Sequence, residues 1–381
     1  MKKIAGFVAE FNPFTKGHEY LIQTIKKEIN PDLIVVAMSP NFVMRGEPAI
    51  FDKWKRAKTA LNFGINLILE IPTIYTIQSA EVFARRGIEI LNDAGITDLF
   101  FGVETTDKAK FMEIIQAMEG KEYQDLLLQF QKDGSSFNSS SKKALITINP
   151  DFEDILKGPN NLLALQYERA VKTINPKIII HYIKRVESGY FDNIHDNVQI
   201  QSATALRNSL VNNNYQKYFS YSVEKWIKHV NNDYFLLIEY RLSSTSISDL
   251  SNILLVTEGL EYRLHNLKMV KDYTDLSSSL ISKRNRETKI HRILTAVLLN
   301  AQKIESNNEP LDSIKVLGFD GLGEEHLGSL KMAPVKFISR IRRVVDLKIK
   351  REIDFTKIYA MPHQENDLIR MEYSPIIIKK D

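Results

Sequence analysis

The sequence predicts an α/β protein, in which a Rossmann-like parallel sheet with helices on both faces is followed by a mostly helical second half. In the first half, apolar stretches of strand length alternate with amphipathic helical patterns, which is typical of a parallel sheet. In the second half, apolar residues recur at spacings of three and four, the helical period. Strands are expected from residue 4 and at 35–37, 67–71, 99–103 and 177–184, and helices at 226–242, 248–270 and 289–301.

The boundary between the two halves is expected at the polar run 212–214, which gives domains of 1–213 and 214–381. A short α/β piece is expected inside the second domain, because residues 314–319 have the pattern of a strand. The glycines between 318 and 328 lack the spacing of nucleotide-binding loops. They predict a turn that leads into a helix.

Composition excludes several classes of protein. The 381 residues suffice for two domains, and a hydrophobic content of 44% can fill their cores. There is no cysteine, so disulfides and thiolate metal sites are excluded, and the eight histidines show no metal-ligand clustering. No apolar run approaches the ~20 residues of a membrane span, and the N-terminus lacks a signal-peptide layout. We therefore expect a cytoplasmic protein with no metal site of its own and no membrane segment.

The excess of positive charge lies in the second half of the chain. Residues 1–210 contain 25 basic and 25 acidic side chains, whereas 211–381 contain 26 and 22. Such local excess suits a phosphate backbone, although a pair of solvated helix faces would look the same. The clusters are Lys283, Arg284, Arg286, Lys289 and Arg292, and Lys331, Lys336, Arg340, Arg342, Arg343, Lys348 and Lys350.

The most informative segment is 11–18, Phe-Asn-Pro-Phe-Thr-Lys-Gly-His, which joins the first strand to an amphipathic helix. The first turn of a helix leaves backbone N–H groups unpaired, so a strand, a tight turn and a helix start form a site for phosphate. Gly17 permits close approach, and His18 can donate a hydrogen bond. The segment has the Pro-Phe-x-x-Gly-His form of the nucleotidyltransferase signature, with Thr15 in place of the usual first histidine. A loop that simply enters a helix is the alternative.

Further polar segments follow the other predicted strands. Because parallel strands end at one rim of a sheet, where ligands bind, these segments are expected close together. They are 39–48, 78–84, 101–104, 158–161, 184–185 and 202–207.

In combination, segments 11–18, 41–49, 78–81, 158–161 and 202–207 make the chain resemble the bacterial tRNA(Met) cytidine acetate ligase family, a branch of the nucleotidyltransferase superfamily. The resemblance covers nearly the whole length. It implies an ATP-dependent enzyme that adenylates acetate and passes the acetyl group to the wobble cytidine of elongator tRNA(Met), giving N4-acetylcytidine. It also implies that 1–213 is the catalytic domain and that 214–381 binds the tRNA.

The resemblance further implies a set of site residues. His18 and Lys16 would stabilise the phosphates, Arg207 would clamp the leaving pyrophosphate, and Ser202 and Thr204 would offer hydroxyls. The ATP contacts would be Phe7, Val8, Ala9, Glu10, Phe11, Asn12, Pro13, Phe14, Thr15, Gly17, Glu19, Tyr20, Gly102, Asn160, Arg185, Ser202 and Thr204.

Three of these positions lie outside the turn, and two of the three also have other interpretations. Gly102 would let the nucleotide approach the backbone. Asn160 would contact adenine or ribose, but it could be a helix N-cap. Arg185 would pair with phosphate, but it could be a surface charge.

The loop with Asn41, Arg45 and Glu47 is expected where the second substrate enters. It could bind acetate or an RNA phosphate, or hold only an Arg45–Glu47 ion pair. Lys283, Arg284, Arg286, Lys289 and Arg292 are the expected tRNA-binding residues, with Tyr262, Tyr273 and Phe337 as candidate stacking partners. Magnesium is expected to arrive with ATP, and nothing in the sequence calls for an obligatory protein partner.

Two other functions agree with the same residues. A nucleotidylyltransferase that acts on a phosphorylated small molecule would keep the same nucleotide site without needing a basic second domain. A non-catalytic tRNA-binding protein with a vestigial nucleotide site would agree with Thr15 in the signature.

Overall fold

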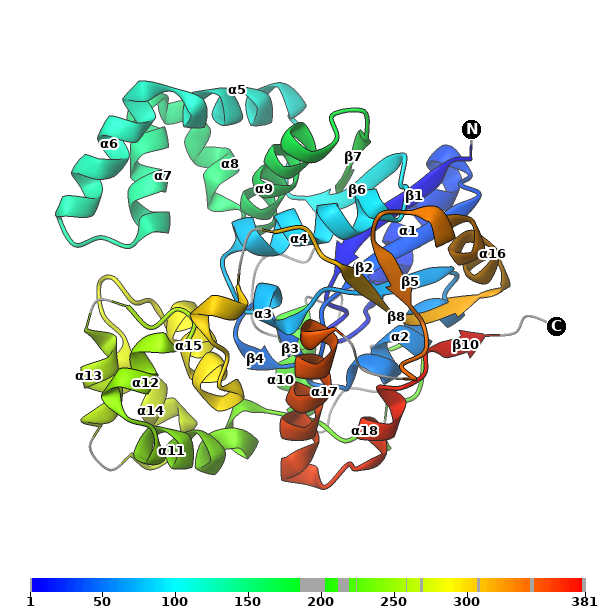
Figure 1. Cartoon of the computed structure of the whole chain (residues 1–381). Helices are drawn as coiled ribbons and strands as arrows, with labels where there is room; N and C mark the ends of the chain where they lie inside the picture. Colours follow the sequence, from blue (N-terminus) through cyan, green and yellow to red (C-terminus); the bar gives the residue numbers. More distant parts are fainter. Residues whose placement is uncertain are drawn as a thin grey trace.

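The structure is a computed structural model of the whole chain (Figure 1). The residues that it describes are 2–185, 203–211, 219–223, 225–257, 259–267, 270–306, 309–342 and 346–378. The predicted boundary at 212–214, as well as Ser202 and Arg343, lie outside these residues.

One eight-stranded sheet forms the centre of the molecule, in the order β10-β8-β5-β2-β1-β6-β7, with β9 paired to β8. All pairings in it are parallel except that of β5 with β8. The predicted α/β class is therefore confirmed. The strands are β1 (Ile4–Ala9), β2 (Leu33–Met38), β5 (Leu67–Glu70), β6 (Asp98–Val103), β7 (Ile179–Lys184), β8 (Ser313–Asp320), β9 (Lys336–Ile338) and β10 (Ile376–Ile378).

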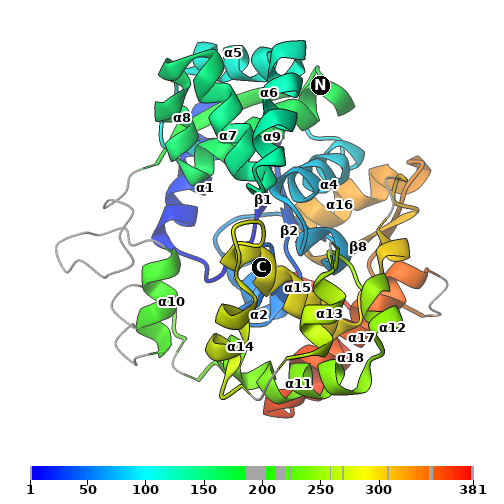
Figure 2. The same cartoon turned by 90° about the vertical axis from the view of Figure 1, so that its left-hand side faces the viewer.

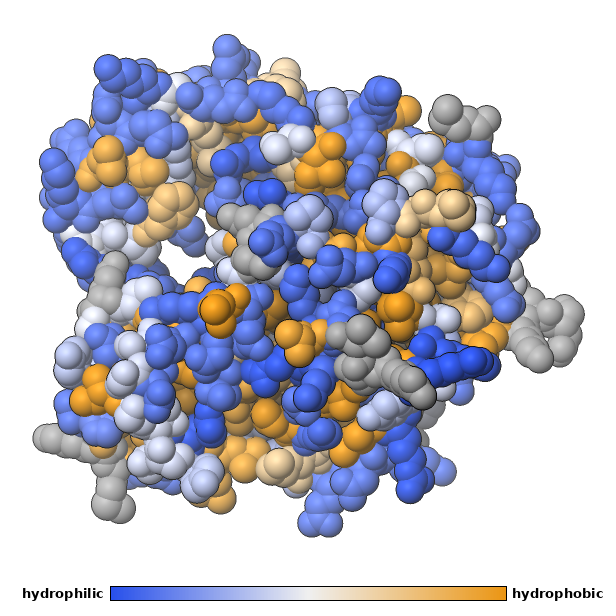
Figure 3. All heavy atoms as spheres, in the orientation of Figure 1, coloured by the Kyte–Doolittle hydropathy of each residue, from blue (hydrophilic) through white to orange (hydrophobic). Residues whose placement is uncertain are grey.

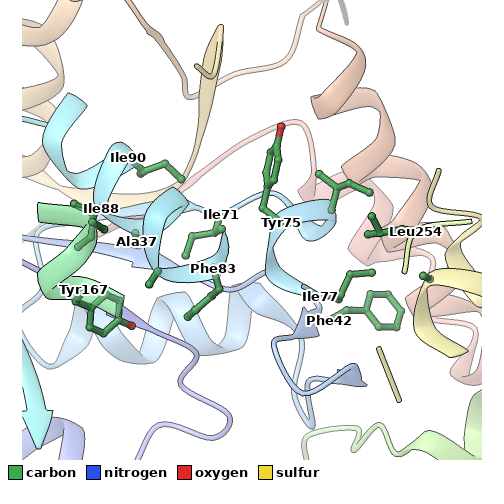
Figure 4. Packing of buried hydrophobic residues seen from close by; sticks show 14 of the residues in the cluster. Ala37, Phe42, Ile71, Tyr75, Ile77, Phe83, Ile88, Ile90, Tyr167 and Leu254 are labelled. Atoms are coloured by element: carbon green, nitrogen blue, oxygen red, sulfur yellow. The ribbon is translucent and has the colours of Figure 1, made fainter. Parts of the chain in front are cut away.

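Helices cover both faces of this sheet. Side chains alternate along each strand, so on β2 Ile34 and Val36 enter one core, while Val35 and Ala37 enter the other. Figure 4 shows part of the second core, where Ala37 lies near Ile88. The first core is closed by α1 (Lys16–Ile29) and α2 (Lys53–Asn62), and the second by α4 (Ala80–Asp93) and α9 (Pro159–Ile174).

Two helical lobes project from the sheet on the same side (Figures 1 and 2). The first is inserted between β6 and β7, and the second follows α10 (Ala203–Val211) and agrees with the predicted helical second half. The first lobe contains α5 (Lys108–Glu119), α6 (Lys121–Lys132), α7 (Phe137–Ile148) and α8 (Glu153–Lys157). The second contains α11 (Phe235–Ser244), α12 (Ile247–Asn252), α13 (Leu260–His265), α14 (Tyr273–Leu280) and α15 (Glu287–Leu299).

After the second lobe the chain returns to the sheet. The predicted strand near residue 314 is β8, and the predicted turn into a helix is the start of α16 (Gly321–Ser329). The last elements are α17 (Leu347–Ala360), α18 (Asp367–Met371) and β10. The sheet therefore takes strands from both sides of residue 213, so a boundary at this residue would cut through the sheet.

Buried ion pairs fasten this returning segment to the sheet. Lys53 on α2 lies 2.8 Å from Glu372, and Lys315 on β8 lies 3.6 Å from Glu70 at the end of β5. Lys53 also pairs with Glu70, and Lys315 with Glu372. All four side chains are almost completely buried, so removing any one of them would leave an uncompensated charge in the core.

Another ionisable side chain, buried near these four, makes the free energy of unfolding depend on pH. Glu352 on α17 accepts hydrogen bonds of 2.6 Å from the amide and the hydroxyl of Thr73. Burial and the neighbouring Glu70 raise the pKa of Glu352 from 4.5 to about 7. Since the folded chain binds the proton more tightly, the contribution of Glu352 to stability is present below pH 4.5 and is lost as the pH rises through 7.

We predict that Glu352→Gln, which imitates the protonated carboxyl, becomes more stable relative to the wild type as the pH rises. The difference in the free energy of unfolding should grow by about 1–2 kcal/mol between pH 5.5 and 7.5. Urea unfolding at both values measures it. Glu325→Gln, which removes an exposed charge paired with Lys2, should show no such change. An equal pH response of the two variants would contradict the prediction.

Candidate functional site

The Gly-His turn lies at the carboxyl end of β1, where α1 begins. Thr15 is the N-cap of α1, and His18 is the third residue of the helix. The backbone N–H of Thr15 donates to Nδ1 of His18 over 2.9 Å, and the Thr15 hydroxyl lies 3.0 Å from the same nitrogen. Because Nδ1 is the acceptor, the ring hydrogen is on Nε2. Within the described residues this N–H and the amides of Lys16 and Gly17 have no hydrogen-bond partner.

His18 acts as a neutral hydrogen-bond donor. Its ring is packed against Phe11 and Phe14, at centroid distances of 4.9 and 5.4 Å. Burial, together with the positive charge of Arg185, lowers its pKa to about 3. The side chain therefore stays uncharged at physiological pH, and Nε2–H and the helix N-terminus are donors that can attract an anion.

Thr15 explains how the turn works without the first histidine of the signature. Its side chain is buried and its hydroxyl lies against the acceptor nitrogen of His18. It contributes no imidazole, but it orients the one that is present. This contact between the two side chains is what the sequence did not reveal.

Arg207 reaches the same turn from α10. Its guanidinium donates to the carbonyl of Asn12 over 2.8 Å and to the hydroxyl of Thr204 over 3.0 Å. The structure thus brings Arg207 and Thr204 to the predicted turn, with Thr204 holding the arginine. Asn12 in turn accepts a hydrogen bond from the amide of Ile50 over 2.8 Å.

The other predicted contacts around the turn differ in exposure. Lys16, Gly17 and Glu19 are half-buried, and Tyr20 is exposed. Val8 and Glu10 are half-buried, and Glu10 accepts a hydrogen bond of 2.7 Å from the amide of Met44. The remaining side chains fill the core, so they can offer a nucleotide only their backbone; these are Phe7, Ala9, Phe11, Pro13 and Phe14.

A second group of predicted residues meets at the ends of β6 and β7. The Asn160 amide oxygen accepts from Arg185 over 3.4 Å, and the Asn160 side-chain amide donates to Glu104 over 2.7 Å. Asn160 is not the N-cap of α9, because Gly158 takes that position, and Glu104 accepts hydrogen bonds from the first-turn amides. A side chain at Gly102 would contact the stem of Arg185 at 3.1 Å. The glycine therefore makes room for that arginine, and contact of Gly102 with a nucleotide stays a prediction.

Sequence reasoning missed Arg56, whose guanidinium is completely buried beneath the rim. It donates to the carbonyls of Glu10, Ser39, Pro40 and Phe51. These carbonyls belong to the segments that follow β1 and β2. The available signal was a charged residue among the apolar residues Trp54, Ala57, Ala60 and Leu61 of the helix at 53–62.

The loop at 41–48 forms a small hairpin of β3 (Phe42–Val43) and β4 (Glu47–Pro48). Asn41 is buried and bonded to the Lys53 amide and the Thr356 hydroxyl, so its role is structural. Within the described residues Arg45 and Glu47 do not form the ion pair that was one alternative. Glu47 instead lies 3.4 Å from His291 on α15.

The predicted tRNA-binding residues lie between α14 and α15 and on the first turns of α15. Lys283 donates to the carbonyl of Asp133 over 2.7 Å, so the two lobes touch at their tips. Figure 3 shows that the surface is hollowed between the lobes. Lys283, Arg284 and Arg286 are exposed, and Lys289 is half-buried. Arg292 is also half-buried, and it donates to the carbonyls of Gln78 and Thr288, so its role is structural.

The candidate stacking residues differ in the same way. Tyr262 is exposed, Phe337 is half-buried, and Tyr273 is buried, which leaves Tyr262 as the one with a free face. Among the described residues no helix is both long and apolar enough to cross a membrane.

Comparison with known proteins agrees with this geometry. The family model described as HIGH Nucleotidyl Transferase matches residues 1–372. The sheet, the Gly-His turn and this match together define the chain as a nucleotidyl transferase of the HIGH class.

Similar proteins with known names identify the family within this class. The chain is 32% identical to the tRNA(Met) cytidine acetate ligase of Fusobacterium nucleatum over 100% of both proteins, and 34% identical to that of Caldicellulosiruptor saccharolyticus over 99% of both. It therefore belongs to the tRNA(Met) cytidine acetate ligase family. A crystal structure of Thermotoga maritima TmcAL bound with alpha-thio ATP matches with a TM-score of 0.86 and 25% identity, covering 99% of this chain and 100% of the other.

We predict that Thr15→Val weakens ATP binding several-fold, because it removes the hydroxyl beside Nδ1 of His18, and lowers the free energy of unfolding by about 1 kcal/mol through the loss of that hydrogen bond. Isothermal titration with ATP and thermal unfolding measure the two effects. Thr15→Ser should bind like the wild type. Thr24→Val, which removes a hydroxyl bonded to the Tyr20 carbonyl on the same helix, is the matched control. ATP affinity unchanged in Thr15→Val would show that the hydroxyl does not orient the imidazole.

Proposed function

We propose that this protein adenylates acetate with ATP and transfers the acetyl group to the exocyclic amine of the wobble cytidine in elongator tRNA(Met). The observation that supports this most is the convergence at one turn of a neutral His18 donor, the unpaired amides of the α1 N-terminus, and Arg207. The names of the relatives supply the substrate class.

In the first step an acetate oxygen attacks the α-phosphorus of ATP, and pyrophosphate leaves. The developing negative charge is met by Nε2–H of His18 and the helix amides, while Arg207 and Lys16 neutralise the leaving group. Adenylation is needed because the acetate carboxylate is a poor electrophile. In the second step the cytidine amine attacks the acetyl carbonyl and expels AMP.

Magnesium enters with the triphosphate in this proposal. Among the described residues no three His, Cys, Asp or Glu side chains form a metal-binding group. In this proposal the phosphates themselves are the natural oxygen ligands of the metal.

The experiment that tests the function is pyrophosphate release from ATP and magnesium with and without acetate, followed by nucleoside mass analysis of added elongator tRNA(Met). Acetate-dependent release with acetylcytidine in the tRNA is the expected result. Release that needs a phosphorylated small molecule instead of acetate would favour a nucleotidylyltransferase. ATP binding without turnover would favour a tRNA-binding protein with a vestigial site.

We predict that His18→Ala lowers acetate-dependent pyrophosphate release by about 100-fold or more, the effect of losing one transition-state donor. The variant should stay folded but unfold at a lower temperature, because it loses the ring contacts with Phe11 and Phe14. His265→Ala, at an exposed histidine on α13, is the control and should keep full activity. Turnover that survives in His18→Ala would remove the turn from the proposed site.

We predict that the double variant Arg284→Ala with Arg286→Ala weakens tRNA binding about 10-fold in 0.1 M salt and lowers the slope of log Kd against log salt by about 1–2. ATP binding should not change. The control is Lys26→Ala with Lys27→Ala, which removes the same charge from the exposed last turn of α1. Equal losses in both double variants would indicate a general charge effect rather than a binding surface.

A further inference from the structure

Glu47 and His291 join the two halves of the chain beside the nucleotide turn. Glu47 lies on β4, and His291 lies on α15 of the second lobe, with 3.4 Å between Oε1 and Nδ1. Their side chains are 25% and 13% exposed. The pair is therefore sheltered but open on one side.

The β3–β4 hairpin that carries Glu47 is fixed in place from both directions. The Met44 amide is bonded to Glu10 and the Ile50 amide to Asn12, which ties the hairpin to the end of β1. The Gly46 carbonyl accepts from the Thr295 hydroxyl over 2.8 Å, which ties it to α15. Gly46 has φ +77° and its α-carbon faces the α15 backbone so closely that a Cβ would lie 2.2 Å from the Arg292 nitrogen.

The charges around Glu47 keep it ionised. Burial by itself would raise its pKa, but the hydrogen bond with His291 and the charges of Arg207 and Arg45 lower it overall. An ionised carboxylate beside Nδ1 holds the ring hydrogen on that nitrogen. Nε2 of His291 then carries a free lone pair, the arrangement in which an imidazole accepts a proton.

Tyr273 on α14 adds an independent observation. Its ring centroid lies 5.5 Å from that of His291, and only 5% of the residue is exposed. Among the described residues its hydroxyl has no hydrogen-bond partner. A buried hydroxyl without a partner beside a sheltered histidine indicates a place for a polar ligand.

We propose that His291, oriented by Glu47, is the base that takes the proton from the cytidine amine during acetyl transfer. This inference rests on the proposed function. As the amine nitrogen forms a bond to the acetyl carbon, the bond from that carbon to the AMP oxygen breaks, and AMP leaves with the electron pair. The amine proton passes to Nε2 of His291, and Glu47 stabilises the imidazolium.

The test separates the two half-reactions in the full-length protein. Acetate-dependent exchange of labelled pyrophosphate into ATP reports adenylation, and single-turnover formation of acetylcytidine in tRNA(Met) reports transfer. The variants are His291→Ala and Glu47→Gln; the glutamine can donate to Nδ1 and so move the ring hydrogen to Nε2. His265→Ala in the same lobe is the control.

We expect both variants to keep adenylation within about three-fold of the wild type and to lose transfer by about 100-fold or more. Added imidazole should restore transfer in His291→Ala.

Unchanged transfer in His291→Ala, or equal loss of both half-reactions without rescue by imidazole, would overturn the inference. A wild type that exchanges pyrophosphate but forms no acetylcytidine would instead overturn the proposed function, and the inference with it.

Discussion

The buried guanidinium of Arg56 is the interaction on which the rim of the sheet depends. Loops at the ends of parallel strands expose carbonyl groups that the sheet itself cannot satisfy. Arg56 donates to four such groups, at Glu10, Ser39, Pro40 and Phe51, and so binds the exits of β1 and β2 to α2. Burial lowers its pKa, yet a guanidinium remains protonated, so the clamp holds at any physiological pH.

In the proposed function, the phosphate site on this rim is built from neutral donors rather than from a cluster of cations. His18 is uncharged because aromatic rings and Arg185 surround it, and its direction is set by the backbone of Thr15. A neutral donor of fixed direction needs no large reorganisation when charge develops on a phosphate, which is the condition for electrostatic catalysis. The positive charge comes from Arg207 on a separate helix. One element therefore supplies the charge, and another fixes the direction of the hydrogen-bond donor.

The sheet and the turn could be predicted from the sequence because both depend on local patterns. The alternation of strand and helix patterns predicted β1, β2, β5, β6 and β7. The Pro-Phe-x-x-Gly-His segment predicted that His18 lies at a helix start. Contacts across large sequence separations could not be predicted in this way. Arg56 looks like an ordinary helix charge in sequence, and the pairing of Glu47 with His291 joins a hairpin to a helix of the other half. The return of β8 to the sheet depends on burying Lys315 against Glu70 and Glu372, which no local pattern encodes.

The returning C-terminal segment also holds the β3–β4 hairpin in place. Asn41 at its start is bonded to Thr356 on α17, and the Ala49 carbonyl at its end accepts from the Tyr359 hydroxyl over 2.7 Å. Helix α17 thus braces the hairpin from behind, while Glu10 and Asn12 hold it to the nucleotide turn. The Thr295 hydroxyl and the close approach at Gly46 then hold α15, and with it His291, against this braced hairpin.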